Sequence, residues 1–459
     1  MYQIDRTVLS RKRFPEACEY CEMNAALAKN LYNAALFRVR QIFTGWDKEQ
    51  RSANEAEVFL EVECLEATYP DIHVKHVVSY KHLEKLMRVT GNPDFFAGLP
   101  MQTAQSIVRQ AVQDFRNWLA ALKAYKADPS KFTGKPRMPG YKKSSYATFS
   151  ITNQDAVLYP ADGGGTELKL PCTKQRIPLP HISPDAVLRE VKVKPYYDSW
   201  LIMLTFDVSE ESLPAGKYMA GIDFGVENIV SMAVNDGSCL ICKGGALKSN
   251  IRLFHKEKAE AVGIITKGHE HMHAVSKHLD YISRKHSCFM LDELHKISTM
   301  VVNYCKVHHV GTLVLGANKG WKDGVSMGGQ NNQAFTSMPI TRLREMIAYK
   351  AILAGIAVIE QEESYTSASS FLDGDFIPVY GVNDAEHKSF SGKRVRRGLY
   401  RSADGTLLNA DINAAANILR KAVPDAFQNI KDFSFLKSPE VVDFKRLNTC
   451  MPVKGIEAA

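Results

Sequence analysis

Residues 218–245 read YMAGIDFGVENIVSMAVNDGSCLICKGG, and this stretch decides the fold of the second half of the chain. Its aliphatic and β-branched residues form three runs of strand length, a composition that suits a pleated, covered surface. The last two runs are joined at Asp236 and Gly237, a pair typical of hairpin turns. Asp223 stands in the first run between two glycines, which permit close approach of a backbone or a phosphate. The stretch predicts three successive strands with an aspartate in the first.

The elements that follow extend this pattern to an α/β fold. Apolar residues at helical spacing predict a long helical stretch over roughly 250–308, and a short aliphatic run predicts a strand at 312–316. A helix from Pro339 to Ala354, a strand at 356–360 and a helix that begins near Ala410 complete the series. Three strands, helix, strand, helix, strand, helix is the order expected of a ribonuclease-H-like fold.

The first half of the chain has a different pattern. Long runs of helical spacing predict helices over 14–43 and 101–126, and Pro129 marks the end of the second one. Short strands separated by Gly, Pro and Asp are expected from about 146 to 208, and residues 208–217 have the composition of a linker.

Composition places broad limits on function. The chain has 459 residues, which is enough for about two to four folding units, and its net charge of +8 favours a polyanionic partner. We expect no membrane partner, since no apolar run is long enough to span a bilayer and the first residues lack the apolar core of a signal peptide. Nine scattered cysteines fit a reducing cytosol.

Basic residues gather in two blocks. Residues 109–143 contain nine lysines and arginines against two aspartates, and residues 388–401 contain six with no acid. Aromatic residues such as Trp118 and Tyr400 lie in the same blocks. Because basic side chains neutralise phosphates and aromatic rings stack on bases, the blocks favour nucleic-acid binding over a merely solvated surface.

Two aspartates lie where an α/β nuclease needs them. Asp223 belongs to the first strand, and Asp411 starts the last helix in the segment NADINAAANI. Cleavage of a phosphodiester with two metal ions needs carboxylates that converge on cations about 4 Å apart. Each aspartate alone could be a turn or capping residue. Together, in this topological order, they predict a metal site with Asp223 and Asp411 as ligands, and oxygen ligands suit Mg²⁺ or Mn²⁺.

Seven segments, from about residue 20 to 420, occur in the order found in one family. The chain resembles the TnpB (OrfB) proteins of insertion sequences, relatives of the miniature type V CRISPR effectors. The segments are AKNLYNAALFRVRQIF (28–43), GKPRMPGYK (134–142), GIDFGVEN (221–228), LGANKGWK (315–322), ESYTSASSFLDGD (363–375), FSGKRVRRGLYRSADG (390–405) and NADINAAANI (409–418).

The resemblance implies an RNA-guided DNA endonuclease of the bacterial cytoplasm that acts at the nucleoid. Its partners would be a guide RNA and a target double-stranded DNA with a short flanking motif, and base pairing would supply most of the specificity. The oligomeric state is left open, as is the choice between a transposon and a CRISPR context.

The resemblance also implies a multidomain α+β and α/β architecture. An N-terminal wedge-type β-barrel would hold an inserted helical recognition segment, and a C-terminal ribonuclease-H-like RuvC domain would hold a small inserted loop that binds target nucleic acid. The expected boundaries are 1–12 and 130–212 for the barrel, 13–129 for the recognition segment, 218–363 and 406–424 for the RuvC domain, 364–405 for the inserted loop and 425–459 for a tail.

Two departures from the family pattern concern the nuclease domain. Many members carry a glutamate at the end of the fourth RuvC strand, where this chain has Gly316. Many also carry a zinc ribbon with two Cys-x-x-Cys pairs, whereas residues 317–410 contain no cysteine. Because a structural zinc site needs four Cys or His ligands, no structural zinc is expected here.

The missing acid has candidates after the fifth strand, in the segment EQEESYTS. The fifth strand of a ribonuclease-H-like sheet opens on the same rim as the first, and a glutamate can reach across one strand spacing of about 4.8 Å. Gly316 would leave room for that side chain. We expect Glu363 to be the third catalytic and metal-binding residue, with Glu362 as the alternative and a solvated acidic turn as the competing reading.

The basic segments provide the expected nucleic-acid contacts. On the first helix, Arg38 and Arg40 would face RNA or DNA, with structural ion pairs to Glu19 or Glu22 as the alternative. A different function remains open as well: a nuclease-inactive, RNA-guided DNA-binding protein that acts as a repressor. A DNA-strand-transfer transposase is disfavoured. The other expected contacts are Lys135, Arg137, Lys322, Lys393, Arg394, Arg396 and Arg397.

Overall fold

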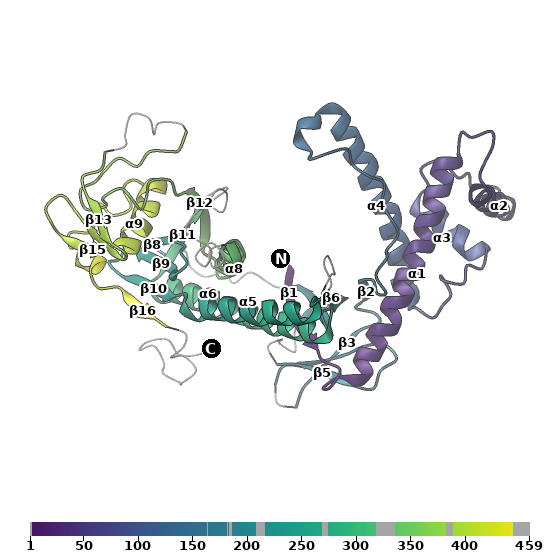
Figure 1. Cartoon of the computed structure of the whole chain (residues 1–459), viewed down its shortest axis with the longest axis horizontal. Coiled ribbons are helices and arrows are strands. Elements are labelled where there is room, and N and C mark those ends of the chain that lie inside the picture. The colour runs from purple at the N-terminus through teal and green to yellow at the C-terminus, as the bar shows by residue number, and fades with distance from the viewer. Residues whose placement is uncertain are drawn as a thin grey trace. The chain divides into compact units, whose positions relative to one another are not determined.

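The computed structural model describes residues 2–162, 164–180, 182, 186–207, 216–268, 274–317, 336–381 and 389–443. The chain divides into two compact units, Met1–Val208 and Ser209–Ala459, and each unit combines helices with sheets (Figure 1). The division falls within the expected linker. The multidomain α+β architecture is confirmed, whereas the finer domain boundaries stay a prediction.

The first unit contains a four-stranded antiparallel sheet with the order β1-β7-β6-β2. The two ends of this unit meet in it, because β1 pairs with β7 from Tyr2, opposite Asp207, to Leu9, opposite Trp200. A second sheet has the order β3-β4-β5. The strands are β1 (Tyr2–Leu9), β2 (Phe149–Thr152), β3 (Val157–Pro160), β4 (Thr166–Lys169), β5 (Arg176–Leu179), β6 (Val187–Tyr196) and β7 (Ser199–Asp207).

The helices of the first unit lie in the chain between β1 and β2. The expected helices 14–43 and 101–126 are found as α1 and α4, and α4 ends just before Pro129 as expected. α2 begins with a capping box, in which Ser52 and Glu55 each accept a hydrogen bond from the other's backbone amide. The helices are α1 (Pro15–Gly45), α2 (Ala53–Thr68), α3 (Tyr80–Val89), α4 (Met101–Ala127) and the 3₁₀ turn η1 (Pro129–Lys131).

The second unit contains a six-stranded mixed sheet with the order β12-β11-β8-β9-β10-β16. β8, β9 and β10 are the three strands expected from residues 218–245. β9 pairs with both β8 and β10, and it runs antiparallel to each of them. β11 runs parallel to β8, and β12 runs parallel to β11. The strands are β8 (Tyr218–Asp223), β9 (Asn228–Val234), β10 (Cys239–Lys243), β11 (Val310–Ala317), β12 (Ala357–Glu362) and β16 (Glu440–Val442).

One expectation for the second unit is wrong. The helical stretch over roughly 250–308 is two helices, α5 (Gly245–Ile265) and α6 (Lys277–Val307). After α5, Gly268 takes a φ of +80°, the left-handed conformation that glycine adopts most readily and that often ends a helix. Ser276 caps α6 by accepting a hydrogen bond from the Leu279 amide. The expected helix from Pro339 is found as α8 (Ile340–Leu353).

The last helix, α9 (Ala410–Ala422), lies against the sheet at β8. Gly221 of β8 makes this close approach possible, since a Cβ at that position would lie 2.3 Å from the carbonyl oxygen of Ala415. Apolar residues of α9 then pack with Val314 of β11 in one buried cluster. The start of α9 is thereby brought to the rim of the sheet where β8 ends.

The chain between β12 and α9 adds a small antiparallel sheet, β13-β14-β15. Tyr400 of β14 is fully buried, and its hydroxyl donates a hydrogen bond to the carbonyl oxygen of Ala368 at 2.7 Å. No helix in the described part of the chain is both long and apolar enough to cross a bilayer. The strands are β13 (Lys393–Arg396), β14 (Leu399–Arg401) and β15 (Leu407–Asn409), and the 3₁₀ turn η2 (Ser434–Leu436) precedes β16.

Candidate active site

Asp223 and Asp411 meet at the rim of the six-stranded sheet. Asp223 is the last residue of β8, and Asp411 lies in the first turn of α9, which Asn409 caps by accepting hydrogen bonds from the amides of Asp411 and Ile412. Burial, reinforced by the negative charges of Glu363 and Asp411, raises the pKa of Asp223 well above its usual value. The rim therefore gathers three carboxylates, with the half-buried Asp223 beside those of Glu363 and Asp411.

Glu363 fills the space that a side chain at position 316 would need. A Cβ built on Gly316 would lie 2.7 Å from Oε2 of Glu363, 2.9 Å from Cδ1 of Ile418 and 3.0 Å from the carbonyl oxygen of Ile222. These distances are shorter than ordinary contacts, so any larger residue at position 316 would have to displace the ends of the Glu363 and Ile418 side chains. Burial raises the pKa of Glu363 as well.

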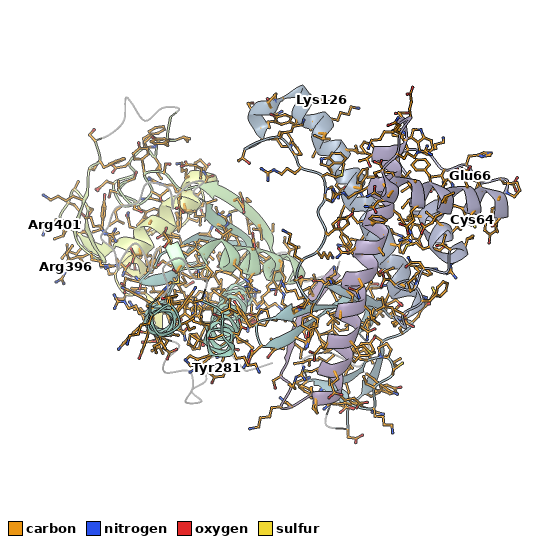
Figure 2. The ribbon with its side chains drawn as sticks, turned by 45° about the vertical axis from the view of Figure 1, so that its right-hand side comes forward. Cys64, Glu66, Lys126, Tyr281, Arg396 and Arg401 are labelled. Carbon is orange, nitrogen blue, oxygen red and sulfur yellow. The ribbon has the colours of Figure 1, made fainter. Side chains whose placement is uncertain are left out.

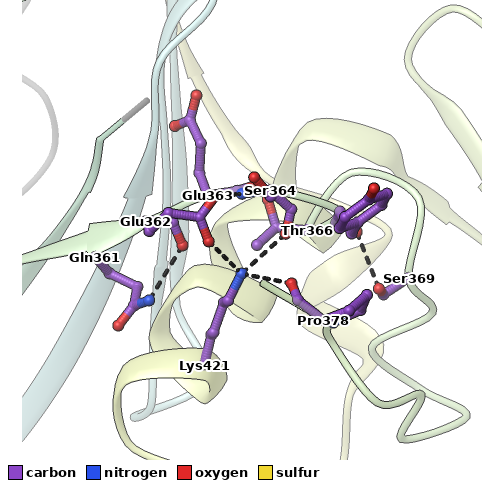
Figure 3. A network of polar contacts seen from close by, with 9 residues as sticks. Gln361, Glu362, Glu363, Ser364, Thr366, Ser369, Pro378 and Lys421 are labelled. Carbon is purple, nitrogen blue, oxygen red and sulfur yellow. Dashed lines mark hydrogen bonds and ion pairs between the residues drawn. The ribbon is translucent and has the colours of Figure 1, made fainter. Parts of the chain in front are cut away.

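Glu362 has a different surrounding, although it is the next residue in sequence. Figure 3 shows its carboxylate turned toward Lys421, whereas that of Glu363 points away from this lysine. Glu362 accepts hydrogen bonds from Lys421 Nζ and from the Ser364 amide, both at 2.7 Å. Burial alone would raise the pKa of Glu362, but these hydrogen bonds outweigh it and lower the pKa. The geometry thus separates the two candidates for the third acid.

Asp411 has two polar partners of its own. Asn228 Nδ2 donates to one carboxylate oxygen at 2.6 Å, and Arg394 donates to the other at 3.0 Å. Asn228 in turn accepts a hydrogen bond from Lys243 at 2.9 Å, which fixes the orientation of its amide. Asn228 is a site residue that the sequence analysis missed, although it closes the segment GIDFGVEN.

The basic residues of β13 and the following turn border the carboxylates. Lys393, Arg394, Arg396 and Arg397 are all exposed, and Arg397 forms an ion pair with Glu227 at 3.4 Å. Figure 2 shows Arg396 projecting outward from the ribbon of the second unit. Residues 393–397, here called the basic hairpin, therefore combine exposed positive charge with a direct contact to Asp411.

The basic residues of the first unit that were expected to contact nucleic acid differ in their exposure and in their partners. Lys135 and Arg137 are exposed, whereas Arg40 lies over the ring of Tyr141, 4.9 Å from its centroid. Arg38 forms a bidentate ion pair with Glu61 of α2, with N–O distances of 2.7 and 2.6 Å.

Arg38 was expected to face RNA or DNA, but in this structure it does not point outward. Its ion-pair partner is also neither of the alternatives, Glu19 or Glu22. The side chain is only 11% exposed because α2 covers this face of α1. Lys322 lies outside the described residues.

The three carboxylates offer only oxygen ligands, a donor set that suits Mg²⁺ or Mn²⁺. As the side chains stand, no three acidic, histidine or cysteine residues within the described ranges lie close enough together to hold one ion. Asp411 has the guanidinium of Arg394 as its counter-ion instead. The donor chemistry fits a divalent cation, and cation binding would compete with this ion pair.

Polar contacts to α9 hold the described part of the cysteine-free segment that follows β12. Asn413 donates to the Ser369 carbonyl at 2.8 Å and accepts from the Phe371 amide at 3.0 Å. Asn417 donates to the carbonyls of Thr366 and Ser369, at 2.9 and 2.8 Å. Both asparagines are fully buried, so these hydrogen bonds are shielded from water.

Comparison with known proteins places the chain among transposition-related proteins. Residues 201–322 match the family described as OrfB_IS605, probable transposase, and residues 341–418 match the Cas12f1-like TNB domain. The TnpB-like protein ORF457 of Acidianus two-tailed virus is 26% identical over 250 residues, which are 53% of this chain and 49% of that protein. The matched region thus spans about half the length of this curated relative.

The matching solved structures are more distant in sequence. A Cas12f1 protein in complex with sgRNA and target DNA is 16% identical, with 89% of this chain and 84% of that chain covered and a TM-score of 0.46. The AacC2c1 protein in a binary complex with sgRNA is 10% identical, with 83% and 65% covered and a TM-score of 0.32.

Both family matches fall almost wholly within the second unit, where the carboxylates and the basic hairpin lie. They assign this unit to a class of transposase-related proteins. Within that class, the chain is similar to TnpB-like proteins and, over residues 341–418, to the TNB domain of the miniature type V effectors.

Proposed function

We propose that the protein is an RNA-guided DNA endonuclease that cleaves target DNA next to a short flanking motif. Asp223, Glu363 and Asp411 are its catalytic and metal-binding residues. One observation carries the proposal: the Glu363 carboxylate occupies the side-chain space of Gly316, beside the end of β8. The acid that many family members carry on the fourth strand is thus replaced by one that follows the fifth.

The topology of the two units supports the expected domains. The strand order β12-β11-β8-β9-β10, with β11 and β12 parallel to β8, is the order of a ribonuclease-H-like RuvC domain. In the first unit, β1 joins the sheet formed by later strands while α1 to α4 lie between them in the chain. This arrangement supports a wedge-type domain with an inserted helical recognition segment.

The carboxylates have a defined chemical task in this proposal. When bound, two Mg²⁺ or Mn²⁺ ions would activate water and stabilise the charge that develops on the scissile phosphate. Asp223 and Glu363 must then be ionised, although burial raises the pKa of both. Arg394, which pairs with Asp411 in the metal-free chain, would then contact a phosphate near the same site.

The partners are a guide RNA and a target double-stranded DNA. Exposed Lys135 and Arg137 in the first unit, and the basic hairpin in the second, offer positive charge for phosphates. Base pairing between guide and target would supply the sequence specificity, and the protein would hold the backbone. The match to the Cas12f1-like TNB domain favours this function over a DNA-strand-transfer transposase.

The test uses the full chain purified with its copurifying RNA, whose sequence defines the target. A plasmid that carries this target and a randomised flank should be cut in the presence of Mg²⁺, and Asp223→Asn or Asp411→Asn should slow cutting by about three orders of magnitude. Guided DNA binding should persist in both variants. If the wild-type complex binds the target but never cuts it, the protein is a nuclease-inactive DNA-binding protein instead.

A further inference from the structure

α9 carries a second polar face in addition to Asp411. Asn413, Asn417, Arg420 and Lys421 are spaced by four, three and one residues, so they lie on one side of the helix. Each donates hydrogen bonds to backbone carbonyls of the segment 364–378, including that of Asp375, which accepts from Arg420 at 2.7 Å. The segment that begins at Glu363 is therefore fastened to the same helix that presents Asp411.

Lys421 makes the contacts nearest to Glu363. Its side chain is only 6% exposed, and Nζ donates to Glu362 Oε2 at 2.7 Å, to the Ser364 carbonyl at 3.0 Å and to the Pro378 carbonyl at 2.9 Å (Figure 3). An ammonium group has three protons, so all of its donors are used. Two of the three acceptors belong to the residues immediately before and after Glu363.

Fixing both neighbours of Glu363 determines where its side chain points. Successive side chains of extended backbone point to opposite sides, and β12 ends at Glu362. With the Glu362 carboxylate held by Lys421, the Glu363 carboxylate is directed the other way, into the space beside Gly316. If the turn were not held by Lys421, either glutamate side chain could rotate into solvent. The only energetic cost would be that of a less preferred rotamer.

We propose that Lys421 is a positioning residue for the catalytic carboxylate of Glu363. It anchors Glu362 and Ser364 to α9, so that this one helix sets both Asp411 and Glu363 at the rim of the sheet. The proposal rests on the proposed function for the role of Glu363, but the fixing of segment 362–378 by Lys421 is a structural claim of its own.

The first test measures the segment itself, in the full chain without added metal. Amide hydrogen exchange is followed by mass spectrometry in peptides that cover residues 359–381 for the wild type, Lys421→Met, Lys421→Arg and Lys431→Met. Lys431 is an exposed lysine of the same unit and serves as the charge-matched control. Lys421→Met should increase exchange in this segment at least tenfold, Lys421→Arg should restore part of the protection, and Lys431→Met should change nothing.

The second test measures what the segment does for the site, by Mn²⁺ titration and by target cleavage at varied Mg²⁺. Lys421→Met should weaken Mn²⁺ binding and raise the half-saturating Mg²⁺ concentration about tenfold, with guided DNA binding unchanged. Lys421→Arg should recover most of the metal affinity, because a guanidinium can donate to the same acceptors. A loss of stability alone would leave the half-saturating Mg²⁺ concentration of the folded fraction unchanged and would overturn the proposal.

The remaining outcomes are distinguishable. Unaltered exchange in Lys421→Met overturns the positioning role, whether or not the wild type cuts DNA. If the wild type does not cut, the proposed function fails, and exchange together with Mn²⁺ binding still decides the role of Lys421. Should Lys421→Met not fold, Glu362→Ala removes one acceptor only, and it must raise exchange around residue 363 for the proposal to stand.

Discussion

Charged side chains are used in opposite ways in the two units. In the first unit, Arg38 and Glu61 form a bidentate pair with side chains 11% and 17% exposed, so each half-buried charge has a partner of opposite sign. In the second unit, Asp223 is half-buried near Glu363 and Asp411, and desolvation together with the like charges of these two residues raises its pKa. Opposite charges lower the free energy of the fold, whereas like charges raise it unless a cation is supplied.

This difference indicates which charged residues stabilise the fold and which have a functional role. Arg38 was expected to contact RNA or DNA, but its guanidinium pairs with Glu61 and holds α1 and α2 together. The carboxylates at the rim of the six-stranded sheet, by contrast, have a geometry that fold stability alone does not explain. The predictions below separate a stabilising use of charge from a catalytic one.

A large effect, smaller than that of replacing a catalytic carboxylate, is expected at Gly316. Gly316→Ala places a methyl group 2.7 Å from Glu363 Oε2 and must displace that carboxylate, so target cleavage should fall about 100-fold while guided DNA binding persists. Cleavage and binding are measured on the same target plasmid.

The matched control for this substitution is Gly263→Ala. Gly263 lies within α5, and a Cβ there would meet no atom within 4 Å. Cleavage should be unchanged, and stability should rise by about 0.5–1 kcal/mol because alanine favours a helix. Equal cleavage by both variants would mean that the space beside Gly316 has no catalytic importance.

A smaller effect is expected for the basic hairpin. Replacing Arg394, Arg396 and Arg397 by alanine should weaken nucleic-acid binding and reduce its salt dependence by up to about three phosphate equivalents. Binding is measured by titration at several salt concentrations. An unchanged slope would show that the exposed arginines are solvated and contact no phosphate.

For Arg38 the expected effect is on stability alone. Arg38→Ala leaves Glu61 without its partner in a half-buried site and should lower the free energy of unfolding by about 1–2 kcal/mol, with RNA retention and DNA binding unaltered. Chemical denaturation and filter binding are the two measurements. Lost RNA retention at unchanged stability would restore the expected role of Arg38 in recognition.

The smallest expected effects are on the pH dependence of stability, and they have opposite directions in the two units. Hydrogen bonds from Lys48, and from the backbone of Ser52, lower the pKa of Glu55 from 4.5 to about 2. Its stabilising contribution is complete above pH 4.5 and is lost as the pH falls toward about 2. Glu55→Gln should therefore lower the unfolding midpoint at pH 7, by a margin that shrinks below pH 4.5.

Asp223 should behave in the opposite way in the metal-free chain. Burial and the nearby carboxylates raise its pKa far above the usual 3.8, so its contribution to stability is present when it is protonated and is lost as the pH rises through the raised pKa. Asp223→Asn cannot ionise and should raise the unfolding midpoint at neutral pH. The difference from wild type should vanish on acidification; a difference that stays constant with pH would exclude this origin.

Local patterns in the sequence predict much of the fold. The strands of residues 218–245 and the helices α1 and α4 follow from side-chain periodicity, which reflects burial on one face. The break between α5 and α6 was missed, since the apolar spacing continues on both sides of the turn at Gly268. Periodicity reports which face is buried and is insensitive to a short interruption.

The candidate site was predictable where topology fixes it. A glycine in place of an acid on the fourth strand, with glutamates after the fifth, leads to Glu363 once the two strands are taken as neighbours. The contacts of Asn228 with Asp411 and of Lys421 with Glu362 join residues 183 and 59 positions apart. No periodicity signals such pairs, and the partner of Arg38 was missed because α2 was not foreseen.

The most direct test of the account compares two adjacent glutamates. Glu363→Gln and Glu362→Gln make the same chemical change, each keeping size and removing one negative charge, at positions whose side chains point to opposite sides of the chain. The measurement is the rate of Mg²⁺-dependent cleavage of the target plasmid by each purified complex, with guided DNA binding recorded in parallel. The account predicts that Glu363→Gln loses cleavage by about three orders of magnitude and keeps binding, while Glu362→Gln retains at least a tenth of the wild-type rate. Full cleavage by Glu363→Gln would contradict it.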